Sequence, residues 1–125
     1  MAMTDVQLTV FLEFTRRYDE IAKHFAIEMR EESSAFDKAY QEKRNSLSED
    51  IRHALLRYFN LCSHEYFLST QGFIDEEVWA VWTRDITAKL KRPLFHDAWA
   101  KARESYSSYP DFQAFMDKLL PSPKS

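Results

Sequence analysis

The stretch RYFNLCSHEYFLSTQGFIDEEVWAVW, residues 57–82, decides the fold because it ends one helix and begins the next. It contains Gly72, the one glycine of the chain, directly after a long run of apolar-periodic sequence. A glycine at this position can take the left-handed conformation that closes the last turn of a helix. Asp75, which is followed by two glutamates, then has the position and chemistry of an N-cap. We therefore predict two consecutive helices joined by a short turn at Gly72.

Length and composition point to a single domain over residues 1–125. One glycine and four prolines leave little turn chemistry for β-hairpins, which argues against a β fold. The single cysteine, Cys62, has no partner for an internal disulfide. No apolar run approaches the roughly 18 residues that a membrane span requires, and no secretory leader is apparent. We therefore expect a cytoplasmic protein without a transmembrane segment.

Apolar residues at spacings of three and four predict an all-α bundle of four main helices plus short helical pieces. The expected helical segments are residues 4–30, 46–71 (opened by a capping box at Ser46), 75–91, 95–106 and 110–119. The first two segments approach roughly 40 Å at ~1.5 Å per residue, so an antiparallel pair would match in length. A polar connector with a short helical piece is expected at residues 31–45, and a frayed tail at residues 121–125.

The second predicted helix has apolar residues around most of its circumference, which places it at the centre of the bundle. Glu65 falls inside this apolar arc, beside Cys62. A buried carboxylate is costly unless it is paired or protonated, so we expect a contact with a Tyr, Trp, His or Arg of another helix. In an aromatic pocket such a carboxylate would suit ligand binding or proton chemistry. The ordinary alternative is a glutamate that leans outward or makes one internal hydrogen bond.

A narrow polar strip lies opposite the apolar arc and consists of His53, Arg57, Asn60 and His64. Their spacings of four, three and four keep them on one side of the helix. Such a strip can bind an anionic group or the acidic face of a partner. The ordinary alternative is the solvated edge of a helix.

The sequence predicts no metal, no cofactor and no catalytic residue of a familiar kind. His53 and His64 would lie roughly 16 Å apart along a helix, too far to share one ion. His64 and Glu65 begin like a zinc-protease helix, but Leu68 stands where the second histidine is needed. The single glycine also excludes a phosphate-binding loop and a Gly-x-Ser-x-Gly elbow.

Two features suggest partners. Aromatic residues make up 15% of the chain, which led us to expect exposed rings that drive homodimerisation along the first helix. The candidates are Phe11, Phe14, Tyr18 and Phe25.

The basic segment, residues 84–103, contains six Lys or Arg against two Asp and could contact nucleic acid or anionic lipid. The net charge of -3 argues against nucleic acid as the main partner, and the helix dipole is the ordinary explanation of the segment.

The segments LLRYFNLCSHEYFL, QGFIDEEVWAVW and PLFHDAW resemble a family of uncharacterised bacterial helical proteins, a domain of unknown function. Its members carry the patterns RYFNLCSEEYxL, GxIDExVWxxW and PxFxxAW, and the likeness is strongest over residues 48–115. Many members have a membrane segment before an aromatic helix similar to LEFTRRYDEI, and this chain has none. The resemblance implies a helical, cytoplasmic protein and supplies no catalytic residue; at the position of His64 members often have glutamate.

We therefore predict a non-enzymatic cytoplasmic module for protein interaction or regulation, with a protein partner or a second copy of itself. The alternative is an enzyme or small-ligand-binding protein that uses Glu65 in an aromatic pocket. A third possibility is binding of nucleic acid or a membrane surface through the basic segment. A pocket containing Glu65 would favour the second function, and an exposed aromatic patch the first.

Overall fold

The computed structural model describes residues 2–25, 37–38, 40 and 49–121. The described residues contain helices and no strand, which confirms the predicted all-α bundle. In chain order the elements are α1 (Asp5–Ala22), α4 (Glu49–Thr70), α5 (Glu76–Leu90), α6 (Pro93–Ala102), the 3-10 helix η1 (Arg103–Tyr106) and α7 (Pro110–Leu119). Among these residues no helix is both long and apolar enough to cross a bilayer.

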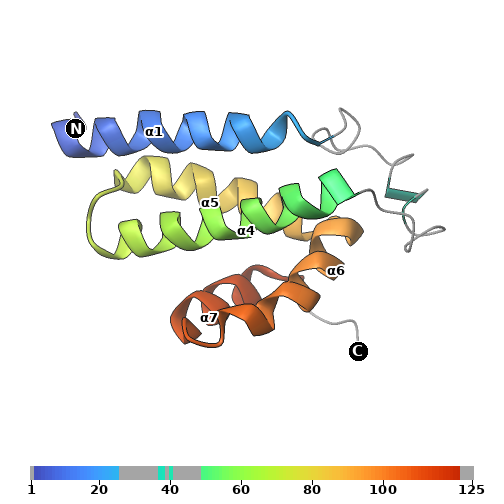
Figure 1. The fold of residues 1–125 in the computed structure, drawn as a ribbon. Helices are drawn as coiled ribbons and strands as arrows, with labels where there is room; N and C mark the ends of the chain where they lie inside the picture. Colours follow the sequence, from blue (N-terminus) through green and yellow to red (C-terminus); the bar gives the residue numbers. More distant parts are fainter. Residues whose placement is uncertain (1, 26–36, 39, 41–48, 122–125) are drawn as a thin grey trace.

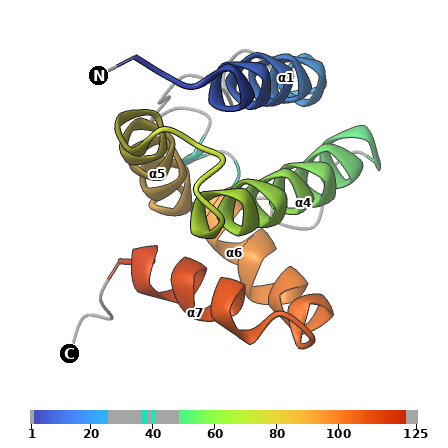
Figure 2. The same cartoon turned by 90° about the vertical axis from the view of Figure 1, so that its left-hand side faces the viewer.

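The helices surround α4. Figure 1 shows α1, α4 and α5 running alongside one another, with α4 antiparallel to the other two. Figure 2 shows α1 and α7 on opposite sides of the molecule, with α4 between them. α4 contacts α1, α5, α6 and α7, as its apolar circumference predicted. Its buried residues are Ala54, Leu55, Tyr58, Phe59, Leu61, Cys62 and Glu65.

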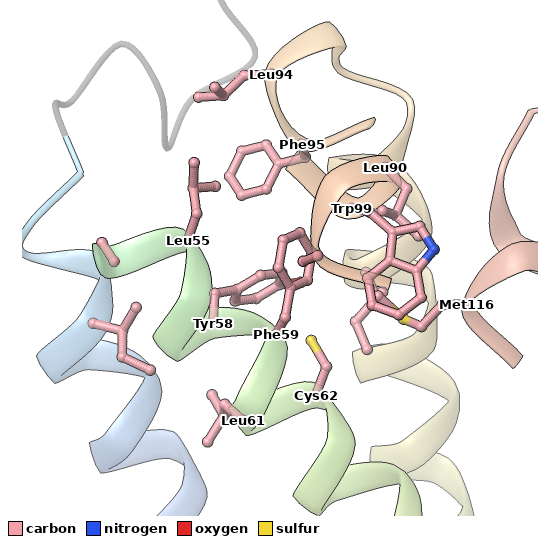
Figure 3. Packing of buried hydrophobic residues seen from close by; sticks show 14 of the residues in the cluster. Leu55, Tyr58, Phe59, Leu61, Cys62, Leu90, Leu94, Phe95, Trp99 and Met116 are labelled. Carbon is pink, nitrogen blue, oxygen red and sulfur yellow. The ribbon is translucent and has the colours of Figure 1, made fainter. Parts of the chain in front are cut away.

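The core consists largely of aromatic rings in mutual contact. Figure 3 shows Phe59 and Cys62 of α4 facing Trp99 of α6, and all three side chains are fully buried. Successive ring centroids lie 4.8 to 6.0 Å apart along a chain formed by Phe25, Phe95, Tyr58, Phe59, Trp99, Phe112, Tyr66, Phe115 and Trp79. Because this chain of rings includes residues of α4, α5, α6 and α7, the aromatic excess of the sequence serves mainly to join the helices.

Gly72 ends α4 as predicted. Its φ is 79°, in the left-handed region. The amides of Gly72 and Phe73 donate to the carbonyls of Ser69 and Leu68 at 3.2 and 3.0 Å. This pair of hydrogen bonds defines a Schellman motif, which satisfies carbonyls that the helix itself leaves without donors.

Side-chain caps order the same end of the bundle. Asp75 accepts hydrogen bonds from two amides in the first turn of α5, as predicted. At the start of α1, Thr4 and Gln7 form a reciprocal capping box with both distances 3.1 Å. The side-chain amide of Gln7 also donates to the carbonyl of Gly72 at 3.2 Å, so the start of α1 is joined to the turn after α4.

α1 ends at Ala22, so the predicted end near residue 30 is wrong. The amides of His24 and Phe25 bond to carbonyls three residues back, which tightens the chain into turns. These turns carry Phe25 into the core, where its ring packs edge-on against Phe95 at 5.7 Å. Burial of Phe25 therefore overrides the helical periodicity. With 18 residues α1 is about 27 Å long, shorter than expected.

The predicted connector and tail lie mostly outside the described residues, as does the Ser46 end of the predicted capping box. Within residues 31–45, Asp37, Lys38 and Tyr40 are described and helical. Asp37 accepts hydrogen bonds from the guanidinium of Arg92 at 3.2 and 3.3 Å. The hydroxyl of Tyr40, a buried residue, donates to Asp97 at 2.9 Å. Both contacts fix this piece of the chain against the start of α6.

The Schellman turn generates a prediction about stability. A Cβ at position 72 would meet no atom within 4 Å, so a substitution there is opposed by the backbone conformation alone. We expect Gly72→Val to lower the free energy of unfolding by at least ~1 kcal/mol, since a β-branched residue tolerates positive φ poorly. Gly72→Asn should cost clearly less, because asparagine enters this conformation more readily. Urea unfolding of the three proteins measures the difference, and a valine variant with the parental midpoint would contradict the assignment.

Candidate functional site

Glu65 is buried, as predicted, with 7% of its surface exposed. It lies in a partly open pocket of about 110 Å³ between α1, α4 and α5, which we call the Glu65 pocket. Four aromatic rings line the walls, those of Phe14, Tyr18, Tyr58 and Trp82. Thr15, Asp85, Ile86 and Lys89 complete the lining.

Tyr18 of α1 and Trp82 of α5 line the pocket beside Glu65, but the Glu65 carboxylate has no hydrogen bond or ion pair to any described residue. The cause is the composition of the walls: α1 presents mainly rings, and α5 presents one cation and one carboxylate. Burial raises the pKa of Glu65 to about 8, an effect that the Lys89 ammonium opposes and the Asp85 carboxylate increases. Glu65 therefore changes its charge close to neutral pH.

The polar groups beside Glu65 are also buried. The hydroxyl of Tyr58 is shielded from solvent and has the Cys62 thiol as its polar neighbour. Burial, above all, raises the pKa of Tyr58 and of the Cys62 thiol well above their ordinary values. Both groups thus stay neutral, and Cys62 lacks the thiolate that a nucleophile requires.

Lys89 places its ammonium over aromatic rings in the same pocket. Its Nζ lies 5.0 Å from the ring centroid of Tyr18 and 5.7 Å from that of Tyr58. Both distances fall within the range of cation–π attraction. The pocket therefore already stabilises an ammonium group.

The predicted polar strip is divided by the structure. Arg57, Asn60 and His64 lie along an open depression on the outer side of α4, which we call the α4 groove. Its larger part has a volume of about 870 Å³ and its adjoining part about 410 Å³. His53 lies outside the groove lining and approaches Glu49 at 3.7 Å on an exposed surface.

The α4 groove has a floor and two walls. α4 forms the floor, α1 contributes Phe14 and Arg17 to one wall, and the turn between η1 and α7 forms the other. Phe67 of the floor and Tyr109 of the turn are each 60% exposed. The groove thus offers large apolar surfaces beside polar ones.

Asn60 has a structural contact that the sequence pattern did not indicate. Its side-chain oxygen accepts a hydrogen bond from the hydroxyl of Tyr106 in η1. This bond holds the second wall of the groove against α4. Asn60 therefore helps to hold the groove in shape. A bound molecule can still reach the N–H groups of its side-chain amide.

The exposure expected for the aromatic residues of the first helix is wrong. Phe14 and Phe25 are buried, with 6% and 3% of their surfaces exposed. Phe11 and Tyr18 are half-buried and pack against rings of α5 and α4. The rings of α1 face inward because α1 packs its aromatic stripe onto α4 and α5. The large apolar residues that α1 does expose are Val6, Leu8 and Leu12.

Three cations of the basic segment are engaged within the molecule. Arg92 is buried and pairs with Asp37 at 3.2 Å. Arg103 pairs with Asp117 at 2.7 Å, and Lys89 turns toward the Glu65 pocket. The exposed cations that remain are Arg84, Lys91 and Lys101. The positive surface is therefore weaker than the sequence suggested.

Sequence reasoning missed Lys89. The signal was present, because Lys89 follows Ile86 by three residues and so shares its face. Tyr109 had no comparable signal, since it lies in a turn without periodicity.

Within the described part of the chain, no three His, Cys, Asp or Glu side chains gather closely enough to hold a metal ion. Comparisons with protein-family models, curated proteins and solved structures give no match to this chain. The resemblance to uncharacterised bacterial helical proteins stays a prediction.

The buried carboxyl generates a prediction about pH. The pKa of Glu65 is about 8 in the folded chain against an ordinary value of 4.5, so folding favours the protonated form. Glu65 makes its full contribution to the free energy of unfolding below about pH 4.5, and this contribution is lost as the pH rises toward 8. This loss is absent from the variants Glu65→Gln and Glu65→Leu. As the pH rises, the free energy of unfolding of both variants should therefore increase relative to that of the parent, by at most ~1.4 kcal/mol per pH unit. Urea unfolding at about pH 5 and pH 8 tests this, and parallel pH profiles would contradict it.

Proposed function

We propose that this protein is a non-enzymatic interaction module that binds an acidic, amphipathic helical segment of a partner protein in the α4 groove. The observation that carries the proposal is the combination of exposed rings and a cation, Arg57, that pairs with no described residue, along one walled helix face. We place this role in the cytoplasm, in line with a single buried cysteine that needs no oxidising compartment.

The shape of the groove suits a helix. A helix laid along α4 would pack its ridges into the grooves of α4 while the two walls set its direction. The floor extends from Asn60 to Gln71, which corresponds to about 17 Å of helix or roughly three turns. Such a segment would cover Phe67 and Tyr109, whose exposed rings are the largest apolar surfaces in the groove. Burying a ring of this kind contributes roughly 1.5–3 kcal/mol.

The charges of the groove select an acidic partner. Arg57 makes no ion pair with a described residue, so its charge remains open to a carboxylate. Arg16 and Arg17 line the same surface, although both bond to Glu13. His64 adds a further nitrogen donor or acceptor. The groove lining also contains the carboxylates of Glu20 and Asp111, so its three arginines exceed its carboxylates by one charge, whereas the whole chain has a net charge of -3.

Small-ligand binding is the second candidate function, and the existence of the Glu65 pocket favours it. Binding of nucleic acid or a membrane through the basic segment has less support, because Arg92 and Arg103 are neutralised within the molecule.

Selection of helical peptides from a random displayed library on the intact protein tests the first proposal. We expect the enriched peptides to combine acidic residues with apolar residues at spacings of three and four. Phe67→Ala should weaken their binding by about tenfold or more, since an anchor ring contributes about 2 kcal/mol or more and each ~1.4 kcal/mol is a factor of ten. Arg57→Glu should weaken binding most at low salt.

Leu56→Ala is the matched control, because Leu56 is exposed on the same helix to 53% but lies outside the groove. It should bind the peptides like the parent. Peptides that bind the parent and Phe67→Ala equally would overturn the proposal. A concentration-dependent dimer that Phe67→Ala dissolves would also overturn it, because the groove would then hold a second copy of the chain.

A further inference from the structure

The Glu65 pocket contains a carboxylate that forms no hydrogen bond or ion pair with a described residue. It is the carboxylate of Glu65, a residue with 7% of its surface exposed. A buried polar group without a partner costs free energy, and native proteins contain few of them. Glu65 lines a partly open pocket, so a molecule that enters the pocket can supply the missing partner of its carboxylate.

The size of the pocket limits what enters. Its volume of about 110 Å³ corresponds to about four waters, or to a short chain of similar size. The aromatic walls favour a cation over an anion, because ring faces are electron-rich. The ammonium of Lys89 over Tyr18 and Tyr58 shows which kind of cation the walls accept.

We propose that the Glu65 pocket binds a primary alkylammonium, the end of a linear amine, in exchange for the ammonium of Lys89. A primary ammonium has three N–H donors, which suit the carboxylates of Glu65 and Asp85 in the pocket lining. A quaternary ammonium has no donor and would leave Glu65 unsatisfied. The hydrocarbon chain of the amine would leave through the open side of the pocket, as the stem of Lys89 does from α5.

This inference rests on the second candidate function and is independent of the α4 groove. The competing cation belongs to the chain itself, so a free amine binds only when Lys89 moves toward solvent. Lys89 thus sets the affinity of the pocket, and its removal should improve binding of an external amine of the same length.

Binding should depend on pH through Glu65. The titratable groups facing it are Tyr18 from α1, Tyr58 and Cys62 from α4, and Asp85 and Lys89 from α5. Burial raises the pKa of Tyr58 and Cys62 well above their ordinary values, so these two stay neutral. The pKa of Glu65 is about 8, and its protonation removes the charge that attracts the amine. Affinity should therefore fall as the pH decreases below 8.

Titration of the intact protein with n-propylammonium chloride, followed by calorimetry and by the Trp82 indole signal in NMR, tests the proposal. This probe has the atoms that Lys89→Ala removes beyond Cβ. At pH ~9 the probe keeps its charge, because primary amines titrate near ~10.4. We expect Lys89→Ala to bind the probe about tenfold more tightly than the parent, and Glu65→Gln in the Lys89→Ala background to lose that gain. Lys91→Ala, which removes an exposed lysine of the same turn region, should bind like the parent.

The neutral isostere n-propanol separates cation binding from filling of an apolar pocket. Binding of n-propanol as tight as that of the amine would overturn the proposal. Equal binding by Lys89→Ala and its Glu65→Gln derivative would overturn it as well, and so would the absence of saturable binding in both the parent and Lys89→Ala, in which case the pocket holds water only. Phe67→Ala should leave amine binding unchanged, so failure at the α4 groove and failure at the Glu65 pocket are distinguishable.

Discussion

The burial of α4 on most of its sides is the constraint on which the other parts of the molecule depend. A helix with apolar residues around most of its circumference requires neighbours in several directions, and α1, α5, α6 and α7 supply them. Because aromatic rings are large, a small number of side chains fills the space between these helices. The α4 groove is a broad side of α4 that the described helices leave open.

The same constraint explains why a carboxylate is tolerated inside. Glu65 lies where α1, α4 and α5 meet. The rings there do not fill the space between the helices completely and leave a small pocket. A leucine would fit the apolar pattern of α4 at this position. At pH values above the ordinary pKa of a carboxyl, the glutamate therefore lowers the free energy of unfolding relative to a leucine. Residues that oppose the local pattern without an evident structural partner are typical of functional positions.

Local signals were sufficient to predict most of the architecture. The turn at Gly72, the cap at Asp75 and the central place of α4 all follow from a few neighbouring residues. The end of α1 did not, because it depends on Phe25 reaching Phe95, a residue far along the sequence. For the same reason the burial of Glu65 was predictable from α4 alone, whereas the two walls of the groove required the packing of other helices.

Phe14 lines both the Glu65 pocket and the α4 groove, so one side chain of α1 belongs to two separate sites. α1 is joined to the rest of the described chain across a long sequence separation, for example through Gln7 and Gly72, and such contacts form only after a large loop has closed. Local detachment of α1 would open both sites at once. Occupancy of either site opposes that detachment, and linkage then requires each ligand to strengthen the binding of the other by the same factor.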